Sequence, residues 1–414
     1  MKGAPTSTTV PPVNASEQRV LVTVAGPDAP GITATLAGII ASAGAHLLDI
    51  EQVVVQGQLT LCLVVGVEPA KGHGAPVVKD LLFAAKELGL DLDFEVLDEK
   101  PAPSRGGAPL YAVTVIGDIV DAAAVHALTS ALASYGANIE TIKRLSDATL
   151  SSFEIVVSVP PNEDQVMALH KELVRIAARH GVDLAFQRER LTRRNKRLMV
   201  MDMDSTLIRI EVIDELARSY GVYEQVAAIT ARAMQGNMPY EQSLTERVAL
   251  LAGMPLSAVM LVAGDPPLME GAPELLKALR VLGLKTAVIS GGFSFAADAL
   301  RARFGLDYAF SNTLEVRDGK LTGRVLEPIV GPQRKADLLD ALAQREGIPL
   351  EQTVAVGDGA NDLLMIEKAG LGIAFHAKPK LRAAADTSLT MGGLDRILYL
   401  LGLRARDVKE LLEG

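Results

Sequence analysis

The sequence predicts an α/β protein in which two small βαββαβ units precede a larger domain built on a parallel sheet. Two observations indicate this: a strand–helix pattern in the front half occurs twice, and apolar runs of the back half end in glycines, acids and hydroxyl residues. A chain of 414 residues with 49% apolar content exceeds one ordinary core. We therefore expect a flexible tail at 1–17, repeats at 18–98 and 109–187, and a third domain at 188–414.

Composition excludes several classes of function. No stretch approaches the ~20 consecutive apolar residues that span a bilayer, so we expect no membrane partner. The net charge of −9 disfavours nucleic acid. Six scattered histidines and one cysteine disfavour zinc, and Cys62 between two leucines reads as a small buried hydrophobe. A single cysteine allows no internal disulfide, which fits a cytoplasmic location.

The front half contains an internal repeat. Val22-Thr23-Val24-x-Gly26 recurs as Val113-Thr114-Val115-x-Gly117, and Gly44-Ala45 recurs as Gly136-Ala137. Each copy shows a strand, a turn, an amphipathic helix, a Gly-Ala turn and two alternating strands. The Pro- and Gly-rich stretch from Lys100 to Pro109 is typical of a linker between the copies.

Each copy resembles the ACT domain, a regulatory module that binds amino acids. The first strand–helix turn, Gly26-Pro27-Asp28-Ala29-Pro30-Gly31, matches that family well. Amides of Gly26 and Gly31 at a helix start suit a carboxylate, and Asp28 suits an ammonium, although Asp28 alone can also be a helix cap. The equivalent turn of the second copy has Gly117 and Asp118 but lacks the Pro-Gly pair. Ligand binding is one role open to this turn, and the alternatives are helix capping or completion of a paired sheet.

Chemistry-bearing residues follow the predicted strands of the back half. Asp202 and Asp204 come directly after the apolar run Leu198-Met199-Val200, and side chains two apart along a strand point the same way. Further apolar runs lead into Ser290-Gly291-Gly292 and into Gly357-Asp358-Gly359-Ala360-Asn361-Asp362, and Lys335 begins a helical pattern. Open α/β sheets bind ligands at the carboxyl ends of their strands, so we expect these groups to converge.

This ordered set closely resembles the haloacid dehalogenase superfamily of phosphotransferases. Within it, Asp202-Met-Asp-Ser-Thr206, Glu211-Val-Ile-Asp214-Glu215 and the Gly357–Asp362 motif look like those of phosphoserine phosphatases. The resemblance covers about the last half of the chain and implies a haloacid-dehalogenase-like Rossmannoid parallel sheet with a helical cap, at about 212–265.

The resemblance also implies roles for the residues. Asp202 is the expected nucleophile, since a carboxylate can form an aspartyl-phosphate, and Asp204 the expected acid and base. Asp202, the backbone carbonyl of Asp204, and Asp358 are expected to hold Mg²⁺. The phosphate is expected to meet Ser290, the Gly291 amide and Lys335. Asn361 is expected on the substrate side and Asp362 behind Lys335 or the metal, although both could simply cap the following helix.

Substrate selectivity is expected from the cap. Glu211 suits the ammonium of the substrate, and Arg247 can bind its carboxylate in bidentate fashion. The alternative for Arg247 is a surface ion pair with Glu241 or Glu246, which would contribute little. Met234 and Tyr240 match apolar cap positions of the family, which commonly has phenylalanine at the latter, and plain cap packing is the alternative for both.

The sequence thus predicts an enzyme that hydrolyses phosphoserine to L-serine and phosphate with Mg²⁺, completing serine biosynthesis, with L-serine or another amino acid as effector. Exposed repeat edges favour a homodimer. Two alternatives stay open: a phosphatase of the same fold for another phospho-amino acid or a phosphoprotein, and a non-catalytic amino-acid sensor. The second is disfavoured because the acids, serine and lysine of the motif set are all present.

Overall fold

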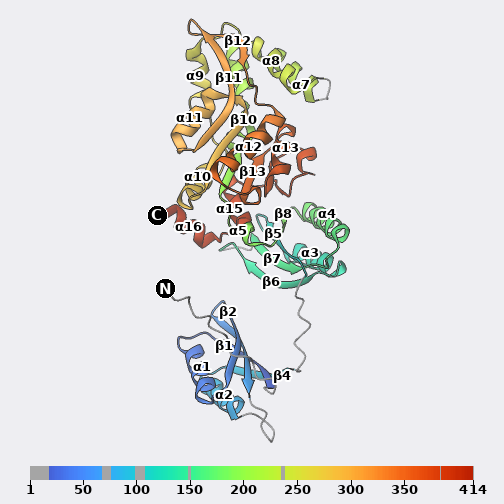
Figure 1. Cartoon of the computed structure of the whole chain (residues 1–414), viewed down its shortest axis with the longest axis vertical. Coiled ribbons are helices and arrows are strands. Elements are labelled where there is room, and N and C mark those ends of the chain that lie inside the picture. The colour runs from blue at the N-terminus through green and yellow to red at the C-terminus, as the bar shows by residue number, and fades with distance from the viewer. Residues whose placement is uncertain are drawn as a thin grey trace, which may run out of the picture. The chain divides into compact units, whose positions relative to one another are not determined.

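The structure is a computed structural model that describes residues 18–67, 76–97, 108–147, 151–234, 238–382 and 384–413. The expected tail at 1–17 lies outside these residues. The chain divides into two compact units, with the boundary between Gly106 and Gly107 (Figure 1). The second repeat therefore belongs to the same unit as the residues that carry the chemistry.

The first unit is one βαββαβ domain. Its antiparallel sheet has the strand order β2-β3-β1-β4, and α1 and α2 pack against each other. Alternate residues of the central strands, among them Val22 and Leu61, are fully buried together with Leu36 and Leu81 of the helices. The elements are β1 (Gln18–Pro27), α1 (Ile32–Ser42), β2 (His46–Val55), β3 (Gln58–Val67), α2 (Pro76–Glu87) and β4 (Asp91–Leu97).

The second repeat has the same order of elements at the start of the second unit. Its helix α4 has a complete set of end signals: Asn162 accepts from the Gln165 amide, acids occupy the first turn, and Gly181 ends the helix in the left-handed conformation at φ 64°. The elements are β5 (Leu110–Ile116), α3 (Ala122–Ser134), β6 (Asn138–Arg144), β7 (Ser152–Ser158), α4 (Glu163–His180) and β8 (Asp183–Arg188).

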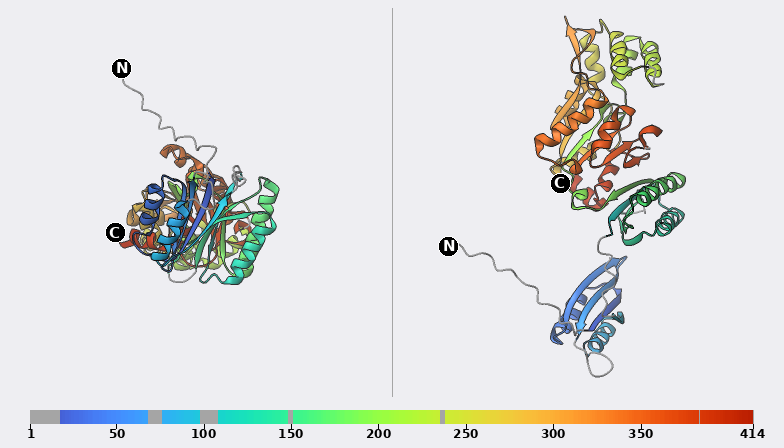
Figure 2. Two further views of the ribbon diagram at one scale, coloured as in Figure 1. Left: turned by 90° about the horizontal axis from the view of Figure 1, so that it is seen from below. Right: turned by 45° about the vertical axis from the view of Figure 1, so that its right-hand side comes forward.

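A parallel sheet with the strand order β11-β10-β9-β13-β14-β15 forms the rest of the second unit, with β12 antiparallel at its edge. Its central strands are short, apolar and buried on both faces, as expected where helices cover both sides (Figure 2). The strands of this part of the sheet are β9 (Leu198–Met201), β10 (Lys285–Phe293), β11 (Tyr308–Arg317), β12 (Lys320–Leu326), β13 (Thr353–Gly357), β14 (Gly372–Phe375) and β15 (Thr387–Leu389).

Helices surround this sheet, and five of the α-helices in the described residues lie between β9 and β10 in sequence, the first four of them at the cap position. The cap helices are α6 (Val212–Tyr220), α7 (Tyr223–Met234), α8 (Tyr240–Ala249) and α9 (Leu256–Ala263). The others are α5 (Leu191–Arg194), α10 (Ala272–Val281), α11 (Ser294–Phe304), α12 (Pro332–Glu346), α13 (Leu363–Lys368), α14 (Pro379–Arg382), α15 (Ile397–Leu400) and α16 (Ala405–Glu413). Among the described residues, no helix is long and apolar enough to cross a bilayer.

Strand β8 of the second repeat pairs antiparallel with β15 of the parallel sheet. One sheet of eleven strands therefore runs through the second repeat and the parallel sheet. Asp183 fixes this junction: its carboxylate accepts from the amides of Thr390 and Met391 at 2.8 and 3.2 Å and from the Thr390 hydroxyl at 2.7 Å. The predicted fold class, a parallel α/β sheet with a helical cap after two βαββαβ repeats, is confirmed, and the continuous sheet is an addition to it.

Candidate active site

Asp202 lies at the carboxyl end of the central strand β9 and is almost fully buried. Its Oδ1 accepts from the Met203 amide at 2.7 Å, and its own amide donates to the Val356 carbonyl at 2.9 Å. The backbone on both sides therefore fixes the carboxylate at the floor of a cavity of about 800 Å³. An ionised carboxylate held in this way can act as a nucleophile.

Lys335, on the first turn of α12, has no solvent exposure and contacts two carboxylates. Its Nζ lies 2.9 Å from Asp202 Oδ2 and 2.7 Å from Asp362 Oδ1. Burial disfavours the charged lysine, but the charges of Asp202 and Asp362 outweigh it and raise the pKa of Lys335. Lys335 is therefore a fixed cation beside Asp202 rather than a solvated helix residue.

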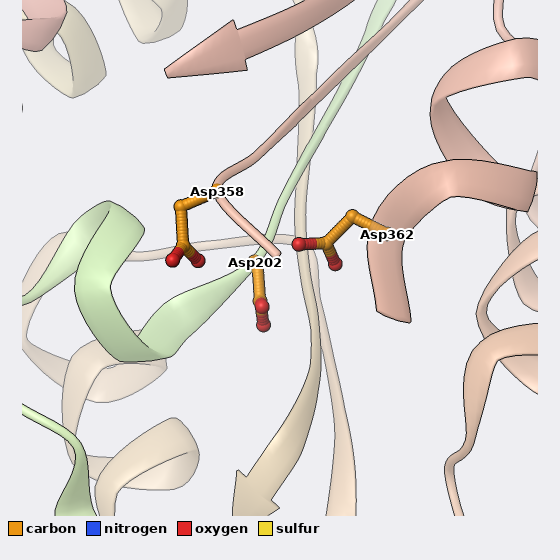
Figure 3. A group of neighbouring side chains, drawn as sticks. All are labelled: Asp202, Asp358 and Asp362. Carbon is orange, nitrogen blue, oxygen red and sulfur yellow. The ribbon is translucent and has the colours of Figure 1, made fainter. Parts of the chain in front are cut away.

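Three acids gather at the ends of β9 and β13 and point toward one another (Figure 3). Asp202, Asp358 and Asp362 each offer an oxygen within 4.8 Å of the others. Burial, followed by the charges of Asp202 and Asp362, raises the pKa of Asp358 to about 8. Carboxylate oxygens crowded in this way suit a hard divalent cation such as Mg²⁺. Asp362 is also engaged by Lys335 and the Gly359 amide, and Asp202 by Lys335 and the Met203 amide, so an ion at this place would share these oxygens with existing partners.

Asp204 is buried beside this group, and its Oδ1 has no hydrogen-bond partner among the described residues. Burial, with the charges of Glu211 and Asp202, raises the pKa of Asp204 well above its ordinary value. A carboxyl that holds its proton more tightly than usual can donate that proton to a leaving oxygen. Its Oδ2 lies against Gly292, where a side chain would have no room.

The phosphate-binding candidates at the end of β10 also line the cavity. Ser290 Oγ accepts from the Gly292 amide at 3.0 Å, which leaves the Ser290 hydroxyl proton available to a ligand. A Cβ on Gly291 would fall 2.0 Å from the Tyr240 hydroxyl, so only glycine allows α8 to come this close.

Glu211 and Arg247 line the same cavity as Asp202 and Ser290. Ser205 Oγ donates to Glu211 Oε1 at 2.7 Å. Arg247 donates through Nε to the Ser243 carbonyl at 3.2 Å, and Glu246 pairs with Arg232 instead. The structure therefore brings a carboxylate and a guanidinium of the cap region to the same cavity as the buried Asp202.

Asn361 lines the cavity, whereas Asp362 lies behind it, fully buried. Asp362 Oδ2 accepts from the Gly359 amide at 3.0 Å while Oδ1 meets Lys335, so it both closes its own turn and holds the lysine. The side chain of Met234 lies outside the described residues.

The first repeat has a smaller cavity, of about 300 Å³, at the start of α1. Asp28 and Gly31 line it together with Thr33 and Gln52, whose side chains bond at 2.7 Å. The start of α1 has no side-chain capping bond, and its N-cap residue is Gly31 rather than Asp28. Gly26 is absent from the cavity lining, and it packs so closely on Leu90 that a Cβ would lie 2.7 Å from that side chain.

The equivalent turn of the second repeat is engaged differently. Asp118 Oδ1 lies 2.6 Å from Arg396 Nη2, in the part of the unit built on the parallel sheet, and Asp121 rather than Asp118 caps α3. Gly117 packs against Val182. This turn contributes to the junction within the second unit, which favours a structural role over ligand binding there.

Sequence reasoning missed four residues at the site. Ser205 and Lys378 line the cavity, Thr206 donates to Asp358 at 3.4 Å, and Asn312 donates from its fully buried amide to the Gly291 carbonyl at 2.8 Å. An asparagine inside strand β11 was a usable signal, because buried amides need partners. Nothing in the sequence distinguishes Lys378 from a surface lysine.

Comparison with known proteins agrees with this geometry. The family model of haloacid dehalogenase-like hydrolases matches residues 196–370, and two ACT-domain models match 18–95 and 110–187. The phosphoserine phosphatase of Mycobacterium tuberculosis is 43% identical over 94% of this chain and 94% of its own length. This chain belongs to the phosphoserine phosphatase family. Another member, the phosphoserine phosphatase of Streptomyces coelicolor, is 44% identical over 94% of this chain and 93% of its own.

Solved structures of the phosphoserine phosphatase family and its superfamily share the fold. A haloacid dehalogenase family hydrolase from Salmonella enterica serovar Typhi has a TM-score of 0.62 at 31% identity, covering 70% of this chain and 98% of that one. A probable phosphoserine phosphatase from Vibrio cholerae, in unliganded form, has a TM-score of 0.54 at 35% identity, covering 74% and 90%.

Proposed function

We propose that this protein hydrolyses O-phospho-L-serine to L-serine and phosphate. The observation that carries the proposal is the shared cavity of Asp202, Ser290, Glu211 and Arg247. The first two suit a phosphate ester, and the last two suit the ammonium and carboxylate of an amino acid. The names of the relatives at 43% and 44% identity support the same substrate.

In the proposed reaction Asp202 attacks phosphorus and the bond to the serine oxygen breaks, giving an aspartyl-phosphate. Asp204 gives its proton to the leaving oxygen, then takes one from the water that hydrolyses the intermediate. Ser290, the Gly291 amide and Lys335 balance charge on the transferring oxygens. When bound, Mg²⁺ held by Asp202, the Asp204 carbonyl and Asp358 would lower the repulsion between nucleophile and phosphate.

The cavity of the first repeat supports a regulatory amino acid, with Asp28 facing its ammonium and the amide end of α1 facing its carboxylate. Inhibition by L-serine that is lost in Asp28→Ala but kept in Asp93→Ala, a change at another acid of the same domain, would support this role. A homodimer, a cytoplasmic location and a place as the last step of serine biosynthesis complete the proposal.

The test is phosphate release from L-phosphoserine with Mg²⁺, comparing the native protein with Asp202→Asn. An amide cannot carry the phosphoryl group, so we expect a loss of at least about a thousandfold. Substantial activity of Asp202→Asn would refute the mechanism. Turnover of phosphothreonine or a phosphoprotein in preference to phosphoserine would refute the substrate, and serine binding without any ester hydrolysis would favour a sensor.

A further inference from the structure

The carbonyl of Gly291 accepts two hydrogen bonds from opposite sides of the site. Tyr240, the first residue of cap helix α8, donates from its hydroxyl at 3.2 Å, and Asn312 of β11 donates from its amide at 2.8 Å. The other end of the Asn312 amide is also fixed, because its Oδ1 accepts from the Val330 amide at 2.8 Å. The sheet and the cap thus hold the same peptide group.

The N–H of the same peptide group contacts Ser290, the residue that we assign to phosphate binding. The Gly291–Gly292 peptide carries the Gly291 oxygen and the Gly292 N–H, and this N–H donates to Ser290 Oγ at 3.0 Å. A peptide group is planar, so fixing the oxygen fixes the direction of the N–H. Donation to the carbonyl oxygen also polarises the N–H and strengthens its own hydrogen bond.

Tyr240 is suited to a permanent donor role. Burial raises the pKa of its hydroxyl to about 12, so the proton stays in place at physiological pH. The absence of a side chain at Gly291 allows the tyrosine to pack closely on this loop.

We propose that Tyr240 is a positioning residue that couples the cap to Ser290 through the Gly291–Gly292 peptide. With the cap in place, three hydrogen bonds orient the Ser290 oxygen, so that its proton faces the phosphate oxygens. Without the tyrosine hydroxyl, Asn312 alone holds the peptide. This inference rests on the proposed phosphate-binding role of Ser290.

The test is Tyr240→Phe, which removes one oxygen and keeps the ring. Tyr220→Phe is the matched control, because Tyr220 also donates from the cap region to a carbonyl, that of Ala252, at 3.0 Å, but is absent from the cavity lining. The inhibition constants of orthovanadate and of inorganic phosphate measure how tightly the phosphate site binds its ligand. We expect both inhibition constants to rise about three- to tenfold in Tyr240→Phe and to stay unchanged in Tyr220→Phe.

A second readout separates positioning from general cap packing. The loss in kcat/KM should be equal for L-phosphoserine and p-nitrophenyl phosphate, because both present a phosphate to Ser290. A loss confined to L-phosphoserine would place the effect at Glu211 and Arg247 and overturn the proposal, as would unchanged vanadate inhibition. Failure of the native protein to hydrolyse phosphoserine would reject the proposed substrate, while the p-nitrophenyl phosphate assay would still test Tyr240.

Discussion

Ser205 holds Glu211 in place from a left-handed backbone conformation. Its Oγ donates to Glu211 Oε1 at 2.7 Å, its φ is 57°, and its amide donates to the Ile210 carbonyl at 3.2 Å. Residues other than glycine rarely adopt this conformation, and where they do the strain often serves a site. Here it directs a hydroxyl at the carboxylate that we assign to the substrate ammonium.

Replacement of Ser205 should affect the amino end of the substrate. We expect Ser205→Ala to raise KM for L-phosphoserine about three- to tenfold with little change in kcat, because Glu211 loses its fixed position. Ser205→Gly relieves the backbone strain but also lacks the hydroxyl, so it should show the same KM. Phosphoglycolate, which has no ammonium, is the control substrate and should be unaffected. An unchanged KM in both variants would show that the hydroxyl does not matter.

Loss of Lys335 should cost both activity and stability. Lys335→Met leaves Asp202 and Asp362 buried without their cation, which we expect to lower the free energy of unfolding by about 3–5 kcal/mol. Hydrolysis should fall at least about a hundredfold. Lys368→Met is the matched control, since Lys368 pairs with Asp340 at 2.9 Å near the surface and should contribute under about 1 kcal/mol. Urea unfolding checks both; equal losses would contradict the prediction.

The crowded acids predict a pH-dependent response to Mg²⁺. Burial raises the pKa of Asp358 to about 8, so the folded metal-free protein keeps a proton that the unfolded chain releases near pH 4 (about the ordinary value). This contribution to stability is present at low pH and is lost as pH rises through about 8. Mg²⁺ replaces the proton, so its stabilising effect should grow over the same window.

Thermal melting with EDTA or Mg²⁺ at several pH values measures this effect. We expect the increase in melting temperature on adding Mg²⁺ to be larger at about pH 8 than at about pH 5.5. Asp358→Asn, which lacks both the titrating group and a ligand charge, should reduce the response and its pH dependence. An Mg²⁺ effect of equal size at both pH values would show that Asp358 does not bind the metal in competition with protons.

The junction at Asp183 should join the second repeat to the phosphatase part as one folding unit. Asp183→Ala removes three accepted hydrogen bonds, and we expect the free energy of unfolding of this unit to fall by about 2–4 kcal/mol. Asp118→Ala is the control, because the Asp118 carboxylate is largely exposed in its pair with Arg396, and this pair should contribute under about 1 kcal/mol. Urea unfolding of the full chain distinguishes them; equal effects would mean that Asp183 does not anchor the sheet.

Much of the site could be predicted because it follows from local pattern and topology. Apolar runs ending in Asp202, Ser290 and Asp358 predicted buried strands, and parallel strands bring their carboxyl ends to one edge of a sheet. The resemblance then assigned Glu211 and Arg247 to substrate, and the structure brings both to that cavity.

Other relationships depend on packing between segments far apart in sequence. Asn312 meets Gly291 across neighbouring strands, and Tyr240 reaches the same carbonyl from the cap. The pairing of β8 with β15 joins residues about two hundred positions apart, and neither strand carries a local signal for its partner.

The sequence by itself determined the two repeats, the α/β class and the residue types of the site, because periodicity and strand-end motifs are local properties of the chain. Only the tertiary structure decided that Lys335 is a buried counter-ion, that Ser205 orients Glu211, and that the second repeat extends the catalytic sheet. Those outcomes depend on burial and on hydrogen-bond partners supplied by distant segments, which a local pattern does not encode.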